Sequence, residues 1–204
     1  MLHKEILTKE QVELLPLVSG FSKKFGMVGG TAIALYIGHR ESIDFDLFSL
    51  EEFDNAPIQR KILKYRKIEE IIRDETGQYT MMIRGVRFTF FHYLYPIKFS
   101  KNFDDVIAMP DLLTLAAMKI FALGRRAKWK DYVDLYFILK NRHSLKEIFK
   151  KAKQIFGNEF NEKLARTQLA YFHDIDYREK IKYLEGFAVR DEAVEKDLTQ
   201  FSLN

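Results

Sequence analysis

Apolar and polar positions in the first fifty residues predict a short unit of helix, strand, turn and helix. Residues 10–24 repeat apolar side chains near helical spacing, and residues 25–28 form a short apolar strand candidate. The glycines at 29–30 interrupt this strand, and residues 31–37 then follow a helical pattern, with Thr31 as a plausible cap. The pattern therefore predicts a glycine turn between a strand and a helix.

Residues 42–48 have the strict alternation of a β-strand. The apolar positions are Ile43, Phe45 and Leu47, and the polar positions between them are Ser42, Asp44 and Asp46. Because side chains alternate between the two faces of a strand, we expect Asp44 and Asp46 to point to the same side.

Three further elements complete the front half. Residues 58–72 carry many charges and are predicted to be helical. Residues 79–83 and 86–94 are predicted strands, and Arg84-Gly85 between them favours a tight hairpin turn.

The back half has a helical pattern throughout. Pro110 opens one helix, residues 129–140 form another, and further helices follow to the end of the chain. We therefore predict an α+β protein, with an α/β core at 1–108 and a helical region at 109–204 that completes the site. The chain has no Pro-, Gly- and Ser-rich linker, so we expect the halves to share one core.

Composition narrows the setting without identifying a function. The 204 residues include no cysteine, which excludes disulfides and thiolate metal sites. No apolar run is long enough to span a bilayer and the N-terminal stretch has no apolar signal segment, so we expect a cytoplasmic protein without membrane contact. The net charge of +4 is a mild lean toward polyanionic partners, although on charge alone a solvated surface with a few extra lysines is the favoured explanation.

The turn and the acidic strand together predict a metal–triphosphate site. Two neighbouring carboxylates, Asp44 and Asp46, repel each other unless a cation lies between them, and Mg²⁺ favours carboxylates combined with phosphate oxygens. Gly29 and Gly30 allow backbone amides to approach a phosphate at a helix start. The alternative for an isolated Asp-x-Asp is a solvated strand edge. The chain has no P-loop and no G-x-G-x-x-G pattern.

Two segments resemble a known family. Residues 29–48 resemble the first motifs of the AbiEii/AbiGii toxin nucleotidyltransferases, and residues 119–139, especially 130–135, are similar to the later motifs. The match extends loosely over residues 14–140. The resemblance implies a polymerase-β-like nucleotidyltransferase fold, Mg²⁺ or Mn²⁺, and transfer of a nucleoside monophosphate from a nucleoside triphosphate. In several branches it also implies a toxin paired with an antitoxin, with transfer RNA as acceptor in some.

The resemblance also assigns roles by motif. Asp44 and Asp46 would bind the metal. The residues implied to contact the nucleotide or to complete the catalytic site are Gly29, Gly30, Thr31, Lys119, Lys130 and Asp134. One position departs from the pattern of many nucleotidyltransferases, because Thr89 stands where a third carboxylate is expected. A threonine cannot accept the proton of an incoming hydroxyl as a carboxylate can.

Helical spacing gives a second reason to place Lys119 in the site. Lys119 shares an inward face with Leu112 and Leu115, where a lysine needs either a partner or an escape to solvent. A phosphate pocket would provide the partner. Asp134 is expected to be partly buried and to orient Lys119 or Lys130, whereas a place early in the helix is sufficient to explain Asp131.

A stretch rich in basic residues interrupts the helical pattern at the start of the predicted helix at 129–140. Arg125, Arg126, Lys128 and Lys130 flank Trp129. We expect Arg126 to help bind the nucleotide, and a solvated loop is the alternative. His92 is a further candidate base near Thr89, although a structural role is the simpler interpretation.

Three functions remain open on the sequence. The first is nucleotidyl transfer to an acceptor hydroxyl, with RNA and transfer RNA as candidate acceptors and an antitoxin as a candidate partner. The second is kinase-like phosphoryl transfer by the same site. The third is nucleotide binding without catalysis, which Thr89 favours.

Overall fold

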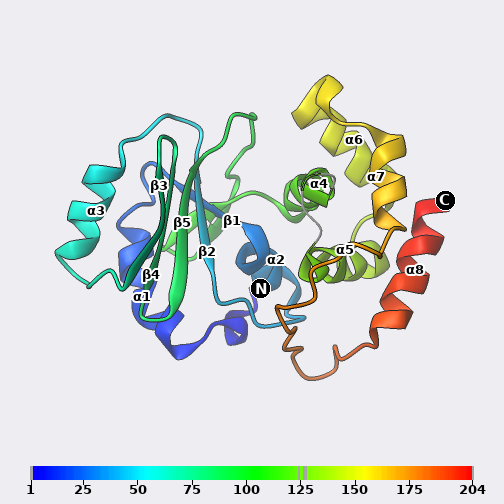
Figure 1. Ribbon diagram of the computed structural model, residues 1–204, viewed down its shortest axis with the longest axis horizontal. Helices are drawn as coiled ribbons and strands as arrows, with labels where there is room; N and C mark the ends of the chain where they lie inside the picture. Colours follow the sequence, from blue (N-terminus) through cyan, green and yellow to red (C-terminus); the bar gives the residue numbers. More distant parts are fainter. Residues whose placement is uncertain (1, 124, 126–127, 204) are drawn as a thin grey trace.

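A computed structural model describes residues 2–123, 125 and 128–203. The α/β part is built on a five-stranded mixed sheet, and two short strands form a separate hairpin (Figure 1). The strands are β1 (Gly26–Val28), β2 (Phe45–Ser49), β3 (Glu70–Glu75), β4 (Gln78–Ile83), β5 (Val86–His92), β6 (Lys101–Phe103) and β7 (Ile107–Met109).

The order of the sheet is β1-β2-β5-β4-β3, and only one of its pairings is parallel. β2 and β5 form that parallel pair, in which Asp46 lies beside Thr89. β1 runs antiparallel to β2 and places Val28 beside Asp46. The sheet register therefore gathers the glycine turn that follows β1, the acidic strand and Thr89 in one region.

Helices make up most of the back half, but residues 170–190 contain no helix, contrary to the prediction of helices throughout this half. The helices of the chain are η1 (Lys4–Ile6), α1 (Lys9–Ser19), α2 (Gly29–Ile37), α3 (Asn55–Leu63), α4 (Leu112–Leu123), α5 (Trp129–Asn141), α6 (Leu145–Phe156), η2 (Gly157–Glu159), α7 (Glu162–Leu169) and α8 (Asp191–Leu203). α2 packs on β1 and β2 and also on α4 and α5, so it joins the sheet to the helical half (Figure 1). Within the described residues, no helix is long and apolar enough to cross a membrane.

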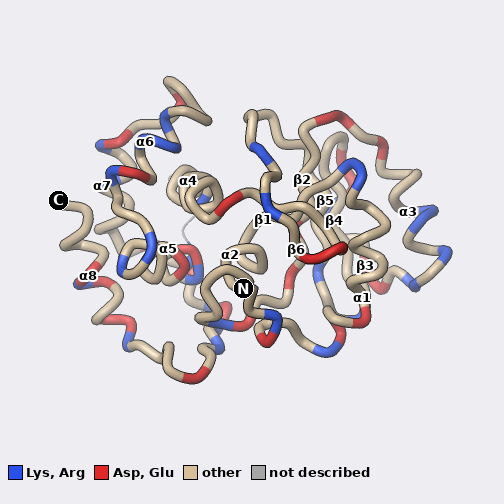
Figure 2. Tube along the Cα trace, turned by 180° about the vertical axis from the view of Figure 1, so that it is seen from behind, with Lys and Arg blue, Asp and Glu red and all other residues tan. Residues whose placement is uncertain are grey.

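The core is continuous across these layers and rich in aromatic rings. In the sheet layer, the Phe45 and Phe88 rings lie 5.2 Å apart between centroids. In the helical layer, Phe121 and Phe156 stack at 3.8 Å. Acidic and basic positions are interleaved along the whole trace rather than segregated to one end (Figure 2). The predicted α+β class, a small mixed sheet with a helical region, is confirmed.

The hairpin turn between β4 and β5 has the predicted tight geometry. Arg84 has φ 54° and Gly85 has φ 72°, so both residues adopt the left-handed conformation that two-residue hairpin turns require. Gly38 has φ 75° and ends α2, as a helix-terminating glycine does.

Three element boundaries differ from the prediction. The predicted helix at 58–72 ends at Leu63, and its last residues belong to β3, all of whose residues are exposed. An exposed edge strand lacks the apolar alternation by which strands are recognised. α2 begins at Gly29, so Thr31 lies inside the helix rather than at its cap. The predicted strand at 42–48 begins at Phe45, which leaves Asp44 just before it.

We predict that Gly26→Ala destabilises the protein because the new methyl group collides with the Phe99 ring. An added Cβ at Gly26 would overlap the ring of Phe99. Overpacking of this kind costs about 1–3 kcal/mol in the free energy of unfolding. Urea unfolding of Gly26→Ala, Phe99→Ala and the double variant measures the coupling, and the double variant should lose less stability than the sum of the two. Strict additivity would show that the ring does not set the cost.

Candidate functional site

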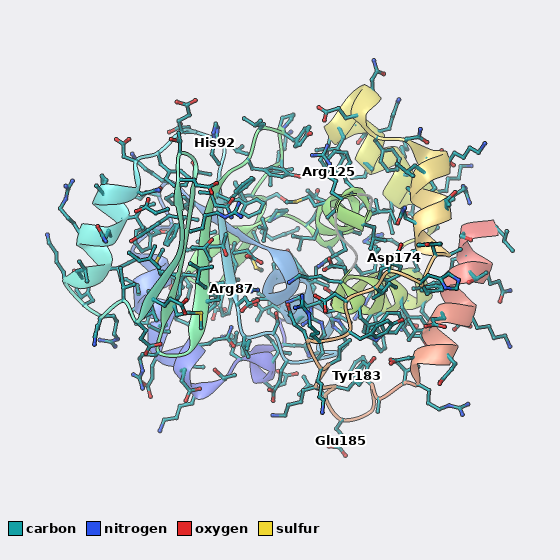
Figure 3. The ribbon with its side chains drawn as sticks, in the orientation of Figure 1. Arg87, His92, Arg125, Asp174, Tyr183 and Glu185 are labelled. Carbon is teal, nitrogen blue, oxygen red and sulfur yellow. The ribbon has the colours of Figure 1, made fainter. Side chains whose placement is uncertain are left out.

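A cavity of about 930 Å³ lies between the sheet and α4. Gly29, Asp46 and Thr89 line it from the side of the sheet and α2, and Met118 and Lys119 line it from α4. Figure 3 shows His92 and Arg125, which also line the cavity, at its sheet and helical sides. The volume is in the range of small-molecule and cofactor sites.

The start of α2 and the Asp46 side chain are in direct contact. Gly29 has φ 75°, and a Cβ added to it would overlap Asp46 Oδ2. Glycine is therefore needed at 29 for its backbone conformation and for the close approach of the carboxylate. The first turn of a helix carries unpaired amides and a partial positive charge, so this corner of the cavity suits anions and a cation held by them.

Asp44 lies at a second, neighbouring cavity of about 510 Å³. Its carboxylate forms an ion pair with Arg87 and lies 3.6 Å from Lys130 Nζ. Arg87, on β5, lines both cavities, and Figure 3 shows it between the sheet and α2. Because Asp44 precedes β2, strand alternation does not fix its direction. The two predicted metal ligands therefore line adjoining cavities rather than the same one.

A buried charge network lies behind the start of α2. Asp134 Oδ1 is 2.8 Å from His39 Nε2 and 2.7 Å from Arg40 Nε, and its Oδ2 is 2.9 Å from an Arg40 terminal nitrogen. Lys119 Nζ lies 3.1 Å from Asp134 Oδ2 and 2.7 Å from Asp131 Oδ1. All five side chains are buried. The network joins the α2–β2 connection to α4 and α5.

The charges of this network balance. Burial alone would raise the pKa of the Asp134 carboxyl, but the charges of Arg40 and Lys119 hold that pKa well below its usual range. Burial lowers the pKa of His39, although Asp134 opposes the shift, so the ring is neutral near pH 7. Its Nε2–H then donates to Asp134, and Nδ1 has no hydrogen-bond partner among the described residues. Two cations therefore face two carboxylates, which is how buried ions are tolerated.

The network extends to the glycine turn. A Cβ added to Gly30 would lie 2.6 Å from an Arg40 terminal nitrogen. Arg40 therefore lies directly under the turn, where Asp134 fixes its guanidinium with two parallel hydrogen bonds. The backbone at the cavity corner consequently depends on an aspartate that is far away in the sequence.

Several predicted site residues occupy other places than expected. Thr31 is buried and lines neither cavity; its hydroxyl contacts the Asp44 carbonyl oxygen and lies 3.0 Å from the Ser42 hydroxyl. Asp134 is fully rather than partly buried, and it contacts Lys119 but not Lys130. Lys130 lines the second cavity and pairs with Glu179.

The remaining predictions are mixed. Lys119 is buried on the inward face, as expected, and it lines the larger cavity. However, Asp131 and Asp134 already give it ionic partners, so its burial does not require a phosphate. Asp131 lies in the first turn of α5, as expected, but its carboxylate is also buried against Lys119, which the sequence analysis did not predict. Arg126 lies outside the described residues.

The sequence analysis missed Arg40, His39 and Arg87 as parts of this region. His39 and Arg40 directly follow Gly38 in the matched segment, which is the signal that marks them. Arg87 is two residues before Thr89 on the same strand, so alternation places both side chains on one face of β5.

The fold is that of nucleotidyltransferase toxins. MenT4, a nucleotidyltransferase toxin from Mycobacterium tuberculosis H37Rv, superposes with a TM-score of 0.61 at 12% identity over 95% of this chain and 82% of that one. JHP933 from Helicobacter pylori superposes with a TM-score of 0.58 at 15% identity, over 97% and 92%. At these identities the likeness concerns the fold.

Sequence comparison identifies the family. The family described as nucleotidyl transferase AbiEii toxin, type IV toxin–antitoxin system, matches residues 17–99 and 96–201, and the chain belongs to it. A relative from Aquifex aeolicus, the uncharacterized protein aq_aa25, is 35% identical over 176 residues, which cover 82% of this chain and 84% of the relative. The predicted resemblance is confirmed.

We predict that Gly29→Ala damages the site beyond its effect on folding. The added methyl group must displace the Asp46 carboxylate, so binding of a magnesium–nucleoside triphosphate, measured by titration calorimetry, should be lost. Gly85→Ala is the matched control, because Gly85 has a similar φ of 72° but open space around a new Cβ. Both variants carry left-handed strain of about 1–2 kcal/mol. Equal nucleotide affinity in the two variants would contradict the role of Gly29.

We also predict that Asp134→Asn lowers the free energy of unfolding by about 3–5 kcal/mol, because it leaves buried cations without their charge partner. The folded-state pKa of Asp134 is depressed, so its contribution is present above the unfolded-state pKa, near 3.9, and declines as the pH falls below that value. The stability difference from the unmodified protein, measured by urea unfolding, should therefore be constant above about pH 5 and shrink in more acidic solution.

The exposed Asp105→Asn variant is the control for Asp134→Asn and should change stability by less than about 0.5 kcal/mol. A difference for Asp134→Asn that does not depend on pH in the acid range would contradict an ionised Asp134.

Proposed function

We propose that this nucleotidyltransferase-toxin family member transfers a nucleoside monophosphate from a nucleoside triphosphate to an acceptor hydroxyl. The observation that supports this best is the contact between Asp46 and the start of α2 at Gly29, at the wall of the larger cavity. This corner combines a carboxylate, the backbone amides of a first helical turn and a space large enough for a nucleotide.

The donor set suits a divalent cation, Mg²⁺ or Mn²⁺. Asp44 and Asp46 supply two carboxylates on either side of Phe45. Among the described residues, no group of three or more His, Asp or Glu side chains is placed to hold a metal. Mg²⁺ is typically held by one or two carboxylates together with substrate phosphates, so this set fits it. When bound, the cation would neutralise phosphate charge and lower the pKa of an acceptor hydroxyl.

Each protein group then has a distinct task. The backbone at Gly29 and Gly30 binds the phosphates. Arg87 pairs with Asp44 and lines both cavities; with a cation bound, Asp44 would help to hold it and Arg87 would offset phosphate charge. Lys119 lines the cavity in a fixed position set by Asp131 and Asp134. Asp134 is a positioning residue, because it is fully buried and acts through Arg40 and Lys119.

The reaction balances without a cofactor other than the cation. The acceptor oxygen forms a bond to the α-phosphorus, the bond from that phosphorus to the bridging oxygen breaks, and pyrophosphate leaves with the electron pair. The hydroxyl proton passes to water. Thr89 lies beside Asp46 in the register, where it cannot accept this proton. His92 lines the same cavity but is three residues further along β5, so we assign it no direct part.

The adjacency of Thr89 and Asp46 also favours a second candidate, nucleotide binding without turnover. Under the leading proposal the protein acts in the cytoplasm as the toxin of a toxin–antitoxin pair. Its proposed partners are a nucleoside triphosphate, an RNA acceptor such as transfer RNA, and a cognate antitoxin.

Asp46→Asn tests the proposal. The purified protein is incubated with nucleoside triphosphates labelled at the α- or the γ-phosphate, and with total cellular RNA and protein. We expect transfer of α-label with release of pyrophosphate, and at least a hundredfold loss in Asp46→Asn, because electrostatic stabilisation of this kind contributes about 10²–10³. Asp105→Asn, an exposed carboxylate, should keep full activity.

Transfer of γ-label would instead establish phosphoryl transfer. Tight magnesium-dependent nucleotide binding without any labelled product would establish the binding-only alternative. Full activity of Asp46→Asn would overturn the assignment of this corner as the metal site.

A further inference from the structure

The smaller cavity has walls from five separate parts of the chain. They are the connection between α2 and β2, Ile72 on β3, the β4–β5 hairpin with Arg87, Lys130 on α5, and the segment between α7 and α8. Arg87 and Ile72 also line the larger cavity, so the two spaces adjoin. Asp44 lines the smaller cavity and Asp46 the larger one. A reaction at this pair of carboxylates can therefore receive one substrate from each side.

The segment that closes the smaller cavity is attached to the residues that precede Asp44. The Glu41 amide donates to the Lys182 carbonyl oxygen at 2.9 Å, and the Leu184 amide donates to the His39 carbonyl oxygen at 3.1 Å. Arg40 and Tyr183 form a β-bridge between these contacts. The wall is thus built by backbone hydrogen bonds and does not rest on side-chain contacts alone.

Basic side chains outnumber acidic ones around the smaller cavity. The basic lining residues are Arg40, Arg87, Lys130, Lys180 and Lys182, and the acidic ones are Glu41, Asp44 and Glu179. Lys182 pairs with Glu41 at 2.6 Å at the exposed rim. Lys180 is exposed and has no ion-pair partner in the part of the chain that the structure describes. Such lysines are suited to phosphodiester groups.

Apolar side chains complete the lining. Ile43 is 52% exposed and Ile72 is 51% exposed, although both are large aliphatic residues. An exposed apolar pair beside lysines matches the two chemical parts of a nucleotide, a flat base and a charged backbone.

Glu179 places a carboxylate beside two further lysines. It accepts a hydrogen bond from Lys128 Nζ at 2.7 Å and pairs with Lys130. Burial opposes its ionisation, but these two lysines lower the pKa of Glu179 to about 2, so it is charged at neutral pH. A carboxylate between two ammonium groups occupies the kind of position that a phosphate of a bound strand would take.

We propose that the smaller cavity is the acceptor site and that it binds the end of a single-stranded RNA. The phosphodiesters lie among Lys130, Lys180 and Lys182, and the terminal ribose hydroxyl reaches Asp44 from the side opposite the nucleoside triphosphate. The phosphate displaces Glu179 from Lys130. This inference rests on the proposed function, because the cavity is an acceptor site only if the chain transfers a group.

Equilibrium binding tests the site without turnover. The probe is a short fluorescent single-stranded oligoribonucleotide with a free terminal hydroxyl, titrated with the full chain over a range of salt concentrations. Lys180→Gln/Lys182→Gln should weaken binding roughly tenfold near 0.1 M salt and reduce the slope of log affinity against log salt by about 1.4. Lys150→Gln/Lys153→Gln is the matched control on α6, an exposed pair with the same charge change at the other side of the helical half (Figure 1).

Glu179→Gln gives a second test, in which binding of the oligoribonucleotide should become tighter rather than weaker. Removing this charge releases Lys128 and Lys130, so oligoribonucleotide binding should tighten by about threefold or more. Glu185→Gln is the control, because Figure 3 shows Glu185 on the same segment at the outer edge of the molecule. Tightening by both variants alike would reflect net charge alone and would overturn the role of Glu179.

The outcomes separate this inference from the proposed function. Weakening in the Lys180/Lys182 variant, with unchanged nucleoside triphosphate affinity, supports the acceptor site even if transfer is never observed. Equal weakening by the α6 control, or no binding of the oligoribonucleotide while a protein in the lysate gains α-label, overturns the acceptor site and leaves nucleotidyl transfer intact.

Discussion

The Asp134 carboxylate is the constraint on which the architecture of the site depends. It lies away from solvent and faces His39, Arg40 and Lys119, which come from the α2–β2 connection and from α4. Two cations in this position would be unfavourable without the matching charges of Asp134 and Asp131. The balance fixes α5 against α4 and places Arg40 under the glycine turn. The helical half therefore sets the geometry of a corner that is built from the first fifty residues.

This arrangement gives Asp44 and Asp46 different surroundings although they are two residues apart. Asp46 lies on β2 against the start of α2, in the larger cavity. Asp44 lies before the strand, paired with Arg87, in the smaller cavity. Carboxylates between two spaces suit a reaction with two substrates, and Arg87, which lines both spaces, is placed to respond to either of them.

Local chemistry made part of this structure predictable from the sequence. Glycine at 29, 38 and 85 and the alternation around Phe45 mark turns and strands by short-range rules, and the hairpin and the mixed fold followed from them. The exposed strand β3 was missed because its side chains carry no apolar period. The sequence named Asp134 as a partner of Lys119 or Lys130 but could not choose between the two lysines, and it did not show that Asp131 is a second partner of Lys119, because a buried ion pair has the same sequence pattern as a solvated one. The position of Thr89 beside Asp46 also depends on the pairing register of β2 and β5, which the sequence does not give.

A crystal structure with a non-hydrolysable nucleoside triphosphate and Mg²⁺ tests the central claim most directly. The account predicts the triphosphate in the larger cavity, its phosphates at the Gly29–Gly30 backbone, the cation on Asp46 and Asp44, and Arg87 moved off Asp44. The Asp134 contacts to Arg40 and Lys119 should be unchanged. A nucleotide bound elsewhere, or one seated there with no cation on either aspartate, would contradict the account.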